Sequence, residues 1–146
     1  MNTASRNVAT ALTYMGALPF WLLMLAPETV LGVSTASVFV SYGATISAFM
    51  AGALWGTKIS GRGDVLMIVS SNVFALVAFA TFVYGLSVTA LLIQMVLFGL
   101  LLLVDYRTLA GRDDQRWYWK LRLRVTAIVA VAYCVMLIDR AVSVSG

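Results

Sequence analysis

Five long apolar stretches, almost free of charged residues, dominate the sequence and restrict the folds that it can adopt. They cover residues 8–26, 37–57, 65–84, 87–104 and 123–141. A helix of about 20 mostly apolar residues crosses the hydrocarbon core of a bilayer. Only 11% of the residues are charged, whereas a soluble domain has about 25%, so water could not solvate the folded surface. We therefore expect an all-α integral membrane protein, a single domain that forms a compact bundle of five transmembrane helices.

Residues 65–104 form one apolar region that is too long for a single span. About 40 helical residues would reach about 60 Å, twice the hydrocarbon thickness, and the turn residues Tyr84-Gly85-Leu86-Ser87 divide the region into two spans. The first stretch is interpreted as a retained span, because Met24-Leu25-Ala26 is a poor signal-peptide cleavage site. Since the N-terminus lacks the features of a transit peptide, we expect a multi-pass protein of the bacterial inner membrane.

The basic residues are distributed very unevenly over the segments between the spans. If the N-terminus is cytoplasmic, nine of the ten Lys and Arg residues fall on the cytoplasmic side, and only Arg140 falls on the other. The nine are Arg6, Lys58, Arg62, Arg107, Arg112, Arg116, Lys120, Arg122 and Arg124. The positive-inside rule therefore predicts a cytoplasmic N-terminus and an external C-terminus.

The segment between the fourth and fifth spans, residues 105–122, is predicted to be a basic cytoplasmic loop with a short interfacial helix after Gly111. Its bases would contact anionic lipid headgroups, at about 1 kcal/mol each, and its tryptophan rings would lie at the boundary between lipid and water. The predicted membrane-interface residues are Arg116, Trp117, Trp119, Lys120, Arg122 and Arg124. Nucleic acid is not expected as a partner, because acids are interleaved with the bases and the rings adjoin a span.

The second span contains a regular series of small residues in the sequence YGATISAFMAGALWG, Tyr42–Gly56. The series consists of Ala44, Ala48, Gly52 and Gly56, and Ser47 and Ala51 widen the face that it forms. Small residues at this spacing allow helix backbones to approach closely, and the last two form a GxxxG motif. We expect this face to be the central packing surface of the bundle. The alternatives are that it leaves room for a ligand, or that it pairs with another subunit or a second copy of the chain.

Few polar residues lie within the spans, and Asn72 in the third span is the most prominent of them. Counted from the cytoplasmic side, Asn72 lies at the depth of the small residues of the second span, whereas Gln94 lies nearer the outer face. We expect Asn72 to form an interhelical hydrogen bond of about 0.6 kcal/mol. The alternative is a ligand contact, and the predicted ligand-binding residues are Trp21, Tyr42, Trp55 and Asn72.

Residue types that carry chemistry are scarce in this sequence. It has no His and a single Cys, Cys134, so no cluster with the spacing of metal ligands exists. No Asp, Glu, Lys or Arg lies in the core of a span, although proton relays and ion-coupled carriers usually place one there. We therefore expect neither enzymatic activity nor a cofactor or metal.

Three segments carry a resemblance to a known family: LTYMGALPFWLL, YGATISAFMAGALWG and LLLVDYRTLAGRDDQRWYWKLRLRVTAIV. Together they resemble a small membrane family of unknown function that includes transmembrane protein sixty-nine of mitochondria. The resemblance covers nearly the whole chain and implies a five-helix inner-membrane protein without catalytic residues. In size and span number the chain is also similar to the tryptophan-rich sensory protein family, which binds porphyrins and sterols, but it lacks that family's Pro- and Trp-dense motifs.

Two classes of function are compatible with these features. The first is a non-enzymatic accessory or assembly subunit, which acts through helix–helix contacts with a larger membrane complex. The small residues of the second span and the scarcity of reactive groups favour it. The second is a binder or carrier of a small uncharged or amphipathic ligand in the bundle, such as a lipid, a quinone or a tetrapyrrole. A solidly packed bundle would indicate the first class and a closed cavity the second.

Overall fold

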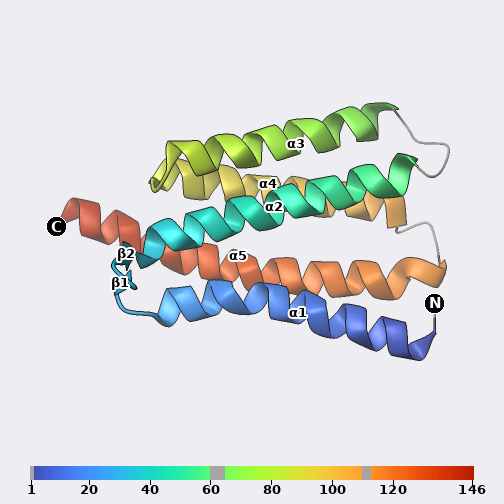
Figure 1. Cartoon of the computed structure of the whole chain (residues 1–146), viewed down its shortest axis with the longest axis horizontal. Coiled ribbons are helices and arrows are strands. Elements are labelled where there is room, and N and C mark those ends of the chain that lie inside the picture. The colour runs from blue at the N-terminus through green and yellow to red at the C-terminus, as the bar shows by residue number, and fades with distance from the viewer. Residues whose placement is uncertain (1, 60–64, 110–112) are drawn as a thin grey trace.

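The computed structural model is a bundle of five long helices, as the five apolar stretches predict (Figure 1). It describes residues 2–59, 65–109 and 113–146, and the side chains of these residues except 55–59, 109 and 114. The helices are α1 (Thr3–Leu25), α2 (Thr35–Ile59), α3 (Val65–Tyr84), α4 (Val88–Leu109) and α5 (Arg116–Ser145). Each is long and apolar enough to cross a membrane. The chain is therefore a multi-pass membrane protein.

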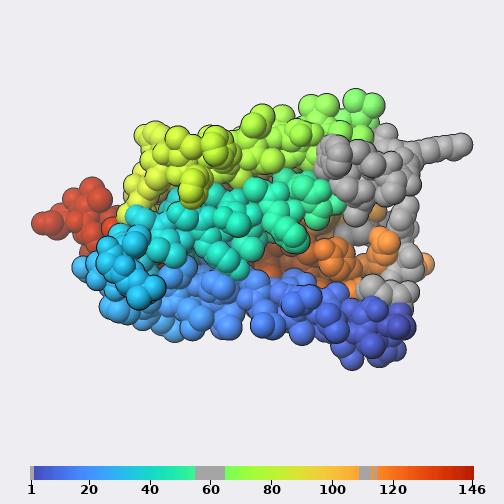
Figure 2. Space-filling view, viewed as in Figure 1, coloured from blue at the N-terminus to red at the C-terminus, as the bar shows by residue number. Residues whose placement is uncertain are grey.

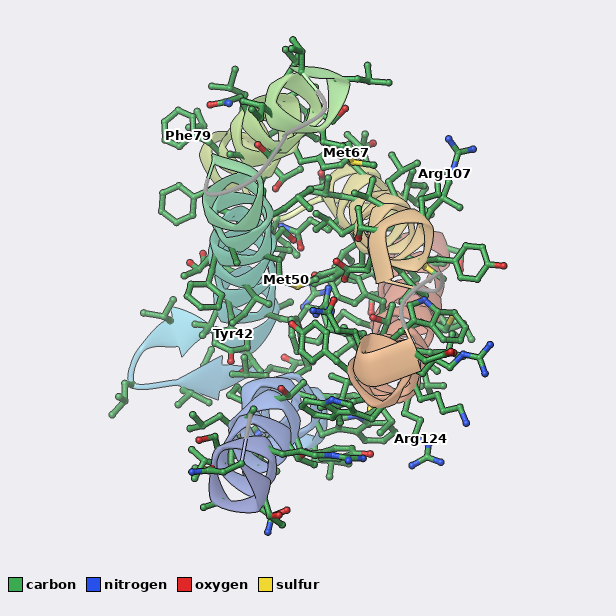
Figure 3. The ribbon with its side chains drawn as sticks, turned by 90° about the vertical axis from the view of Figure 1, so that its right-hand side faces the viewer. Tyr42, Met50, Met67, Phe79, Arg107 and Arg124 are labelled. Atoms are coloured by element: carbon green, nitrogen blue, oxygen red, sulfur yellow. The ribbon has the colours of Figure 1, made fainter. Side chains whose placement is uncertain are left out.

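The helices follow one another around the bundle in chain order (Figure 3). Each packs against its neighbours in sequence, α5 closes the ring against α1, and α2 also contacts α4. The start of α1 and the facing ends of α4 and α5 lie at one end of the bundle (Figure 1). We call this the basic end. Its described basic residues are Arg6, Arg107, Arg116, Lys120, Arg122 and Arg124.

A small β-hairpin, which the sequence does not predict, connects α1 to α2. The strands β1 (Thr29–Val30) and β2 (Val33–Ser34) are antiparallel, and both residues of the turn, Leu31 and Gly32, have positive φ values of 52° and 78°. Positive φ at both positions is typical of a type I′ turn, whose twist matches that of paired strands. The backbone N–H of Thr35 donates to the carbonyl of Glu28 (2.9 Å) and thereby ties the hairpin to α2.

Helices α4 and α5 extend well beyond the predicted spans, so the prediction of a loop over residues 105–122 is largely wrong. Helix α4 continues to Leu109, and α5 begins at Arg116 after a single 3-10 turn, Asp113–Gln115. The predicted interfacial helix is therefore the first part of α5 itself. The 30 residues of α5 reach about 45 Å, which exceeds the hydrocarbon thickness. Lys and Arg are good helix formers, so they end the apolar stretch without ending the helix.

Aromatic side chains fill the middle of the ring where α1, α2, α4 and α5 meet. Phe20, Phe39, Phe98 and Tyr133 are each at most 5% exposed. Five of their pairs have ring centroids between 4.9 and 6.0 Å apart, mostly in edge-to-face arrangements, which aromatic rings prefer. We call these four residues the aromatic core. Helix α3 lies outside it and packs on α2 and α4 through Ala78.

The packing face of α2 differs from the predicted one. Ala44 is 4% exposed and Ala48 is half-buried, but Gly52 is exposed, and a Cβ added there would have no atom within 4 Å. The expectation that Gly52 packs against a helix of the bundle is therefore wrong. The side chain of Trp55 and the surroundings of Gly56 lie outside the described part of the chain.

Helix geometry explains this difference. Residues four apart are rotated by about 40° from one another, so a series with a spacing of four drifts away from any fixed interface. The described buried positions of α2 follow one another at spacings of one, three and four, and they are Thr35, Ala36, Phe39, Val40, Gly43, Ala44, Ser47, Ala51 and Leu54. Of these, Phe39, Ser47 and Ala51 are completely buried.

Candidate functional site

The most extensively bonded buried group of the described chain is the amide of Gln94 in α4, which is 0% exposed. Its Nε2 donates to the carbonyl of Val40 in α2 (2.8 Å) and to Oγ1 of Thr81 in α3 (2.9 Å). Its Oε1 accepts from the hydroxyl of Tyr133 in α5 (2.6 Å). The amide therefore connects four helices at one level. Since an unsatisfied polar group in a bilayer costs several kcal/mol, these bonds hold the helices together. We call Gln94, Tyr133 and Thr81 the glutamine network.

Gly43 of α2 provides the space that the glutamine network needs. A Cβ at this position would lie 2.0 Å from the Tyr133 hydroxyl oxygen and 2.4 Å from Oε1 of Gln94. Real Cβ atoms essentially never come within 3.0 Å of such atoms. Of the two α2 glycines with described surroundings, Gly43 is therefore the one at which the helix approaches its neighbours closely, whereas the sequence predicts this role for Gly52 and Gly56.

The glutamine network stabilises the bundle and has no evident reactive group. Its members are uncharged, and both amide hydrogens, the amide oxygen and the tyrosine hydroxyl are engaged within the bundle. The sequence predicts the depth of Gln94, nearer the outer face, but not its bonds to three other helices. A polar amide inside an otherwise apolar span was the available signal, since such residues usually face the interior of a bundle.

Two of the predicted ligand-binding residues, Trp21 and Tyr42, pack against the buried hydrophobic cluster that includes the aromatic core. The Tyr42 hydroxyl donates to the carbonyl of Gly16 in α1 (2.8 Å), and its ring centroid lies 4.9 Å from that of Phe20. The indole nitrogen of Trp21 is buried without a hydrogen-bond partner among the described residues. Trp55 has no described side chain. No shared pocket of the four predicted residues is therefore seen in the described part of the chain.

The hydrogen bond of Asn72 among the described residues stays within α3, so the expected interhelical bond is wrong. Asn72 lies exposed on the outer side of α3, and its Nδ2 donates to the carbonyl of Ile68 in the same helix (2.9 Å). The buried strip of α3 runs instead through Ser71, Ala78 and Thr81. Counting residues along the span predicts the level of Asn72 in the membrane. It does not predict the rotation of the helix about its axis, which decides whether Asn72 faces the bundle.

Arg122 at the basic end forms an internal ion pair, which corrects its assignment to the lipid headgroups. Its Nε lies 2.8 Å from Oδ2 of Asp105 in α4, with side-chain exposures of 11% for Arg122 and 18% for Asp105. Its guanidinium also reaches Sδ of Met50 in α2 (3.5 Å). Figure 3 shows Met50 pointing into the middle of the bundle. Since α5 begins earlier than predicted, Arg122 lies on a turn that packs against other helices.

The other predicted interface residues lie at the surface of the basic end. Arg116, Lys120 and Arg124 are exposed, and Arg107 and Arg124 point away from the bundle (Figure 3). The guanidinium carbon of Arg6 lies over the half-buried ring of Trp117, 4.7 Å from the ring centroid. The half-buried ring of Trp119 lies 5.3 Å from that of Tyr106 in α4. Among the described residues, no group of three or more His, Cys, Asp or Glu side chains could hold a metal ion.

A family model described as "Protein of unknown function (DUF3429)" matches residues 5–138. No curated protein and no solved structure matches the chain.

Proposed function

The chain belongs to the DUF3429 family of proteins of unknown function, and we propose that it is a non-enzymatic accessory or assembly subunit of a larger membrane complex. In this proposal, the outer side of α3 binds a transmembrane helix of a partner subunit. The observation that carries the proposal is the exposed amide of Asn72 on that side.

The outer side of α3 presents a continuous row of exposed residues. These are Val65, Val69, Asn72, Leu76, Phe79 and Val83, which we call the α3 stripe. Their spacing alternates between four and three, so they lie along one side of the helix, as in the seam of a coiled coil. Helix α3 forms the upper edge of the molecule in Figure 2, and Phe79 points away from the bundle in Figure 3. The α3 stripe is therefore available to a neighbouring helix.

Asn72 supplies a reason for such a helix to bind. It lies seven residues from the start of α3, about 10 Å into a hydrocarbon core of about 30 Å. Its amide oxygen has no hydrogen-bond partner among the described residues. Polar side chains within a bilayer normally face other helices, and a bond across helices contributes about 0.6 kcal/mol and up to about 2 kcal/mol. A partner helix with a polar group at this depth would satisfy the amide.

The packing of the interior favours this function over a ligand held inside the bundle. Phe20 and Phe39 are completely buried at the centre, and the Tyr42 hydroxyl is bonded to the chain itself. A lipid, quinone or tetrapyrrole at the centre would have to displace these rings. Asn72, a predicted ligand contact, faces outward instead.

We expect Asn72→Leu to lower the recovery of the partner about threefold or more, since an interhelical hydrogen bond of this kind is worth about 0.6 kcal/mol or more. The measurement is quantitative mass spectrometry of proteins that copurify with the tagged chain, expressed at native abundance and extracted in mild detergent. Thr45→Val is the matched control, because Thr45 is an exposed polar residue of α2 that bonds only to its own helix. Unchanged recovery of the partner with Asn72→Leu would contradict the proposal. Recovery of further copies of this chain alone would indicate a homo-oligomer and not a complex with another protein.

We also propose that the basic end faces the cytoplasm and that the protein lies in the bacterial inner membrane. The uneven distribution of Lys and Arg supports this orientation, and the resemblance to transmembrane protein sixty-nine supports an inner-membrane location. We expect a reporter active only in the periplasm to be active at the C-terminus. A reporter active only in the cytoplasm should be active when fused between α4 and α5. The opposite pattern of activities would reverse the orientation.

A further inference from the structure

A groove of about 190 Å³ runs between α4 and α5 on the side of the bundle. Its lining is almost entirely apolar and consists of Met95, Phe98, Gly99, Thr126, Val129, Ala130 and Tyr133. The hydroxyl of Tyr133 is already engaged by Gln94. Gly99 is exposed, and a Cβ added there would have no atom within 4 Å. The groove is therefore open to the membrane and owes its space to the small residues Gly99 and Ala130.

A pair of aromatic rings lies where this groove would continue toward the basic end. Tyr106 follows Gly99 by seven residues, and Trp119 precedes Thr126 by seven, which is two helical turns or about 10 Å in each case. Each ring thus lies on the groove side of its helix, and the two centroids are 5.3 Å apart. The indole Nε1 of Trp119 is buried without a hydrogen-bond partner among the described residues. The ring pair of Tyr106 and Trp119 therefore lies beyond the apolar groove, on the side of the basic end.

Two basic residues lie close to Trp119 in α5. Arg116 and Lys120 are within one turn of Trp119, and both are exposed. Arg116 contacts Asp113 (3.2 Å), but the two side chains are 67% and 92% exposed, so water weakens this pair. No ion pair of Lys120 is found among the described residues. An anion near Trp119 would therefore meet two accessible bases.

We propose that the groove between α4 and α5 binds one acyl chain of an anionic phospholipid, and that Arg116 and Lys120 bind its anionic headgroup. The apolar lining matches a hydrocarbon chain, and the adjoining bases match the charge of the headgroup. Basic sites beside grooves between transmembrane helices are suited to anionic lipids for this reason. This site is separate from the α3 stripe, so it does not depend on the proposed function.

Native mass spectrometry of the purified full-length protein tests this site by titration with phosphatidylglycerol and phosphatidylcholine of identical acyl chains. We expect one phosphatidylglycerol molecule to bind about tenfold more tightly than phosphatidylcholine. Gly99→Leu fills the groove and should weaken both lipids about tenfold. The double variant Arg116→Gln/Lys120→Gln should instead remove the preference for phosphatidylglycerol. It should weaken the binding of phosphatidylcholine less, because the choline of that lipid neutralises the charge of its phosphate.

Gly52→Leu is the control for the groove, because Gly52 is also an exposed helical glycine with nothing within 4 Å of an added Cβ. It should bind both lipids as the wild type does. If Gly99→Leu lowers the melting temperature, Ala130→Leu fills the same groove from α5 and should give the same loss. Equal binding of the two lipids by the wild type, or equal affinities of the Gly52 and groove variants, would overturn the proposal.

Discussion

Gly43→Ala is expected to destabilise the bundle by about 3 kcal/mol or more, although it adds only one methyl group. The new carbon would lie 2.0 Å from the Tyr133 hydroxyl oxygen and 2.4 Å from Oε1 of Gln94. Both side chains are completely buried, so neither can move aside without breaking the bond between them (2.6 Å). A broken bond would leave unsatisfied polar groups within the membrane. Thermal unfolding in detergent should show a clearly lower melting temperature.

Two further variants test whether the steric clash is the cause. Gly52→Ala places the same methyl group on the same helix where an added Cβ has no atom within 4 Å, so it should be neutral or stabilise by up to about 1 kcal/mol. Tyr133→Phe removes the oxygen that lies closest to the new methyl group. Combined with Gly43→Ala, it should therefore destabilise by less than the sum of the two single changes. Strict additivity, or equal melting temperatures of the two glycine variants, would refute the close approach at Gly43.

The number of helices and their order could be predicted because the bilayer permits few alternatives. A spanning segment must satisfy its backbone internally, so a stretch of about 20 apolar residues is a helix of known length. Helix α3 accordingly has the predicted bounds, Val65 and Tyr84. The same reasoning fails for α5, where it detects the edge of the hydrocarbon rather than the end of the helix. Residues 116–122 contain three basic residues and are still helical.

The rotation of each helix about its axis could not be predicted, and this accounts for the errors at individual residues. In water, a polar outer face and an apolar inner face reveal which side is buried. In a bilayer both faces are apolar, so this signal is lost. Gly43 and Gly52 are both glycines of the second span, yet of the two only Gly43 is buried. Likewise Gln94 and Asn72 are both amides, and only Gln94 faces the interior.

The ion pair of Asp105 and Arg122 depends on the same rotational information, and its effect on stability should be large. Arg122→Gln should destabilise the protein by about 3 kcal/mol or more, because it leaves the nearly buried carboxylate of Asp105 without its partner. The Nε–Oδ2 distance of 2.8 Å and the exposures of 11% and 18% support a value in this range. Arg122→Lys should recover only part of the loss, since an ammonium group cannot reproduce the planar donor geometry of the guanidinium.

Arg124→Gln, two residues away, is the matched control and should change stability by less than about 0.5 kcal/mol, because Arg124 is exposed. The double variant Asp105→Asn/Arg122→Gln should be more stable than Arg122→Gln alone, since it removes the stranded charge as well. Chemical unfolding in mixed micelles measures all four variants on one scale. If Arg122 were instead one of several interchangeable bases that contact lipid headgroups, Arg122→Gln and Arg124→Gln would both lower the free energy of unfolding by similar, small amounts. That result would mean that the contact with Asp105 contributes nothing, and that Arg122 acts through the headgroups after all.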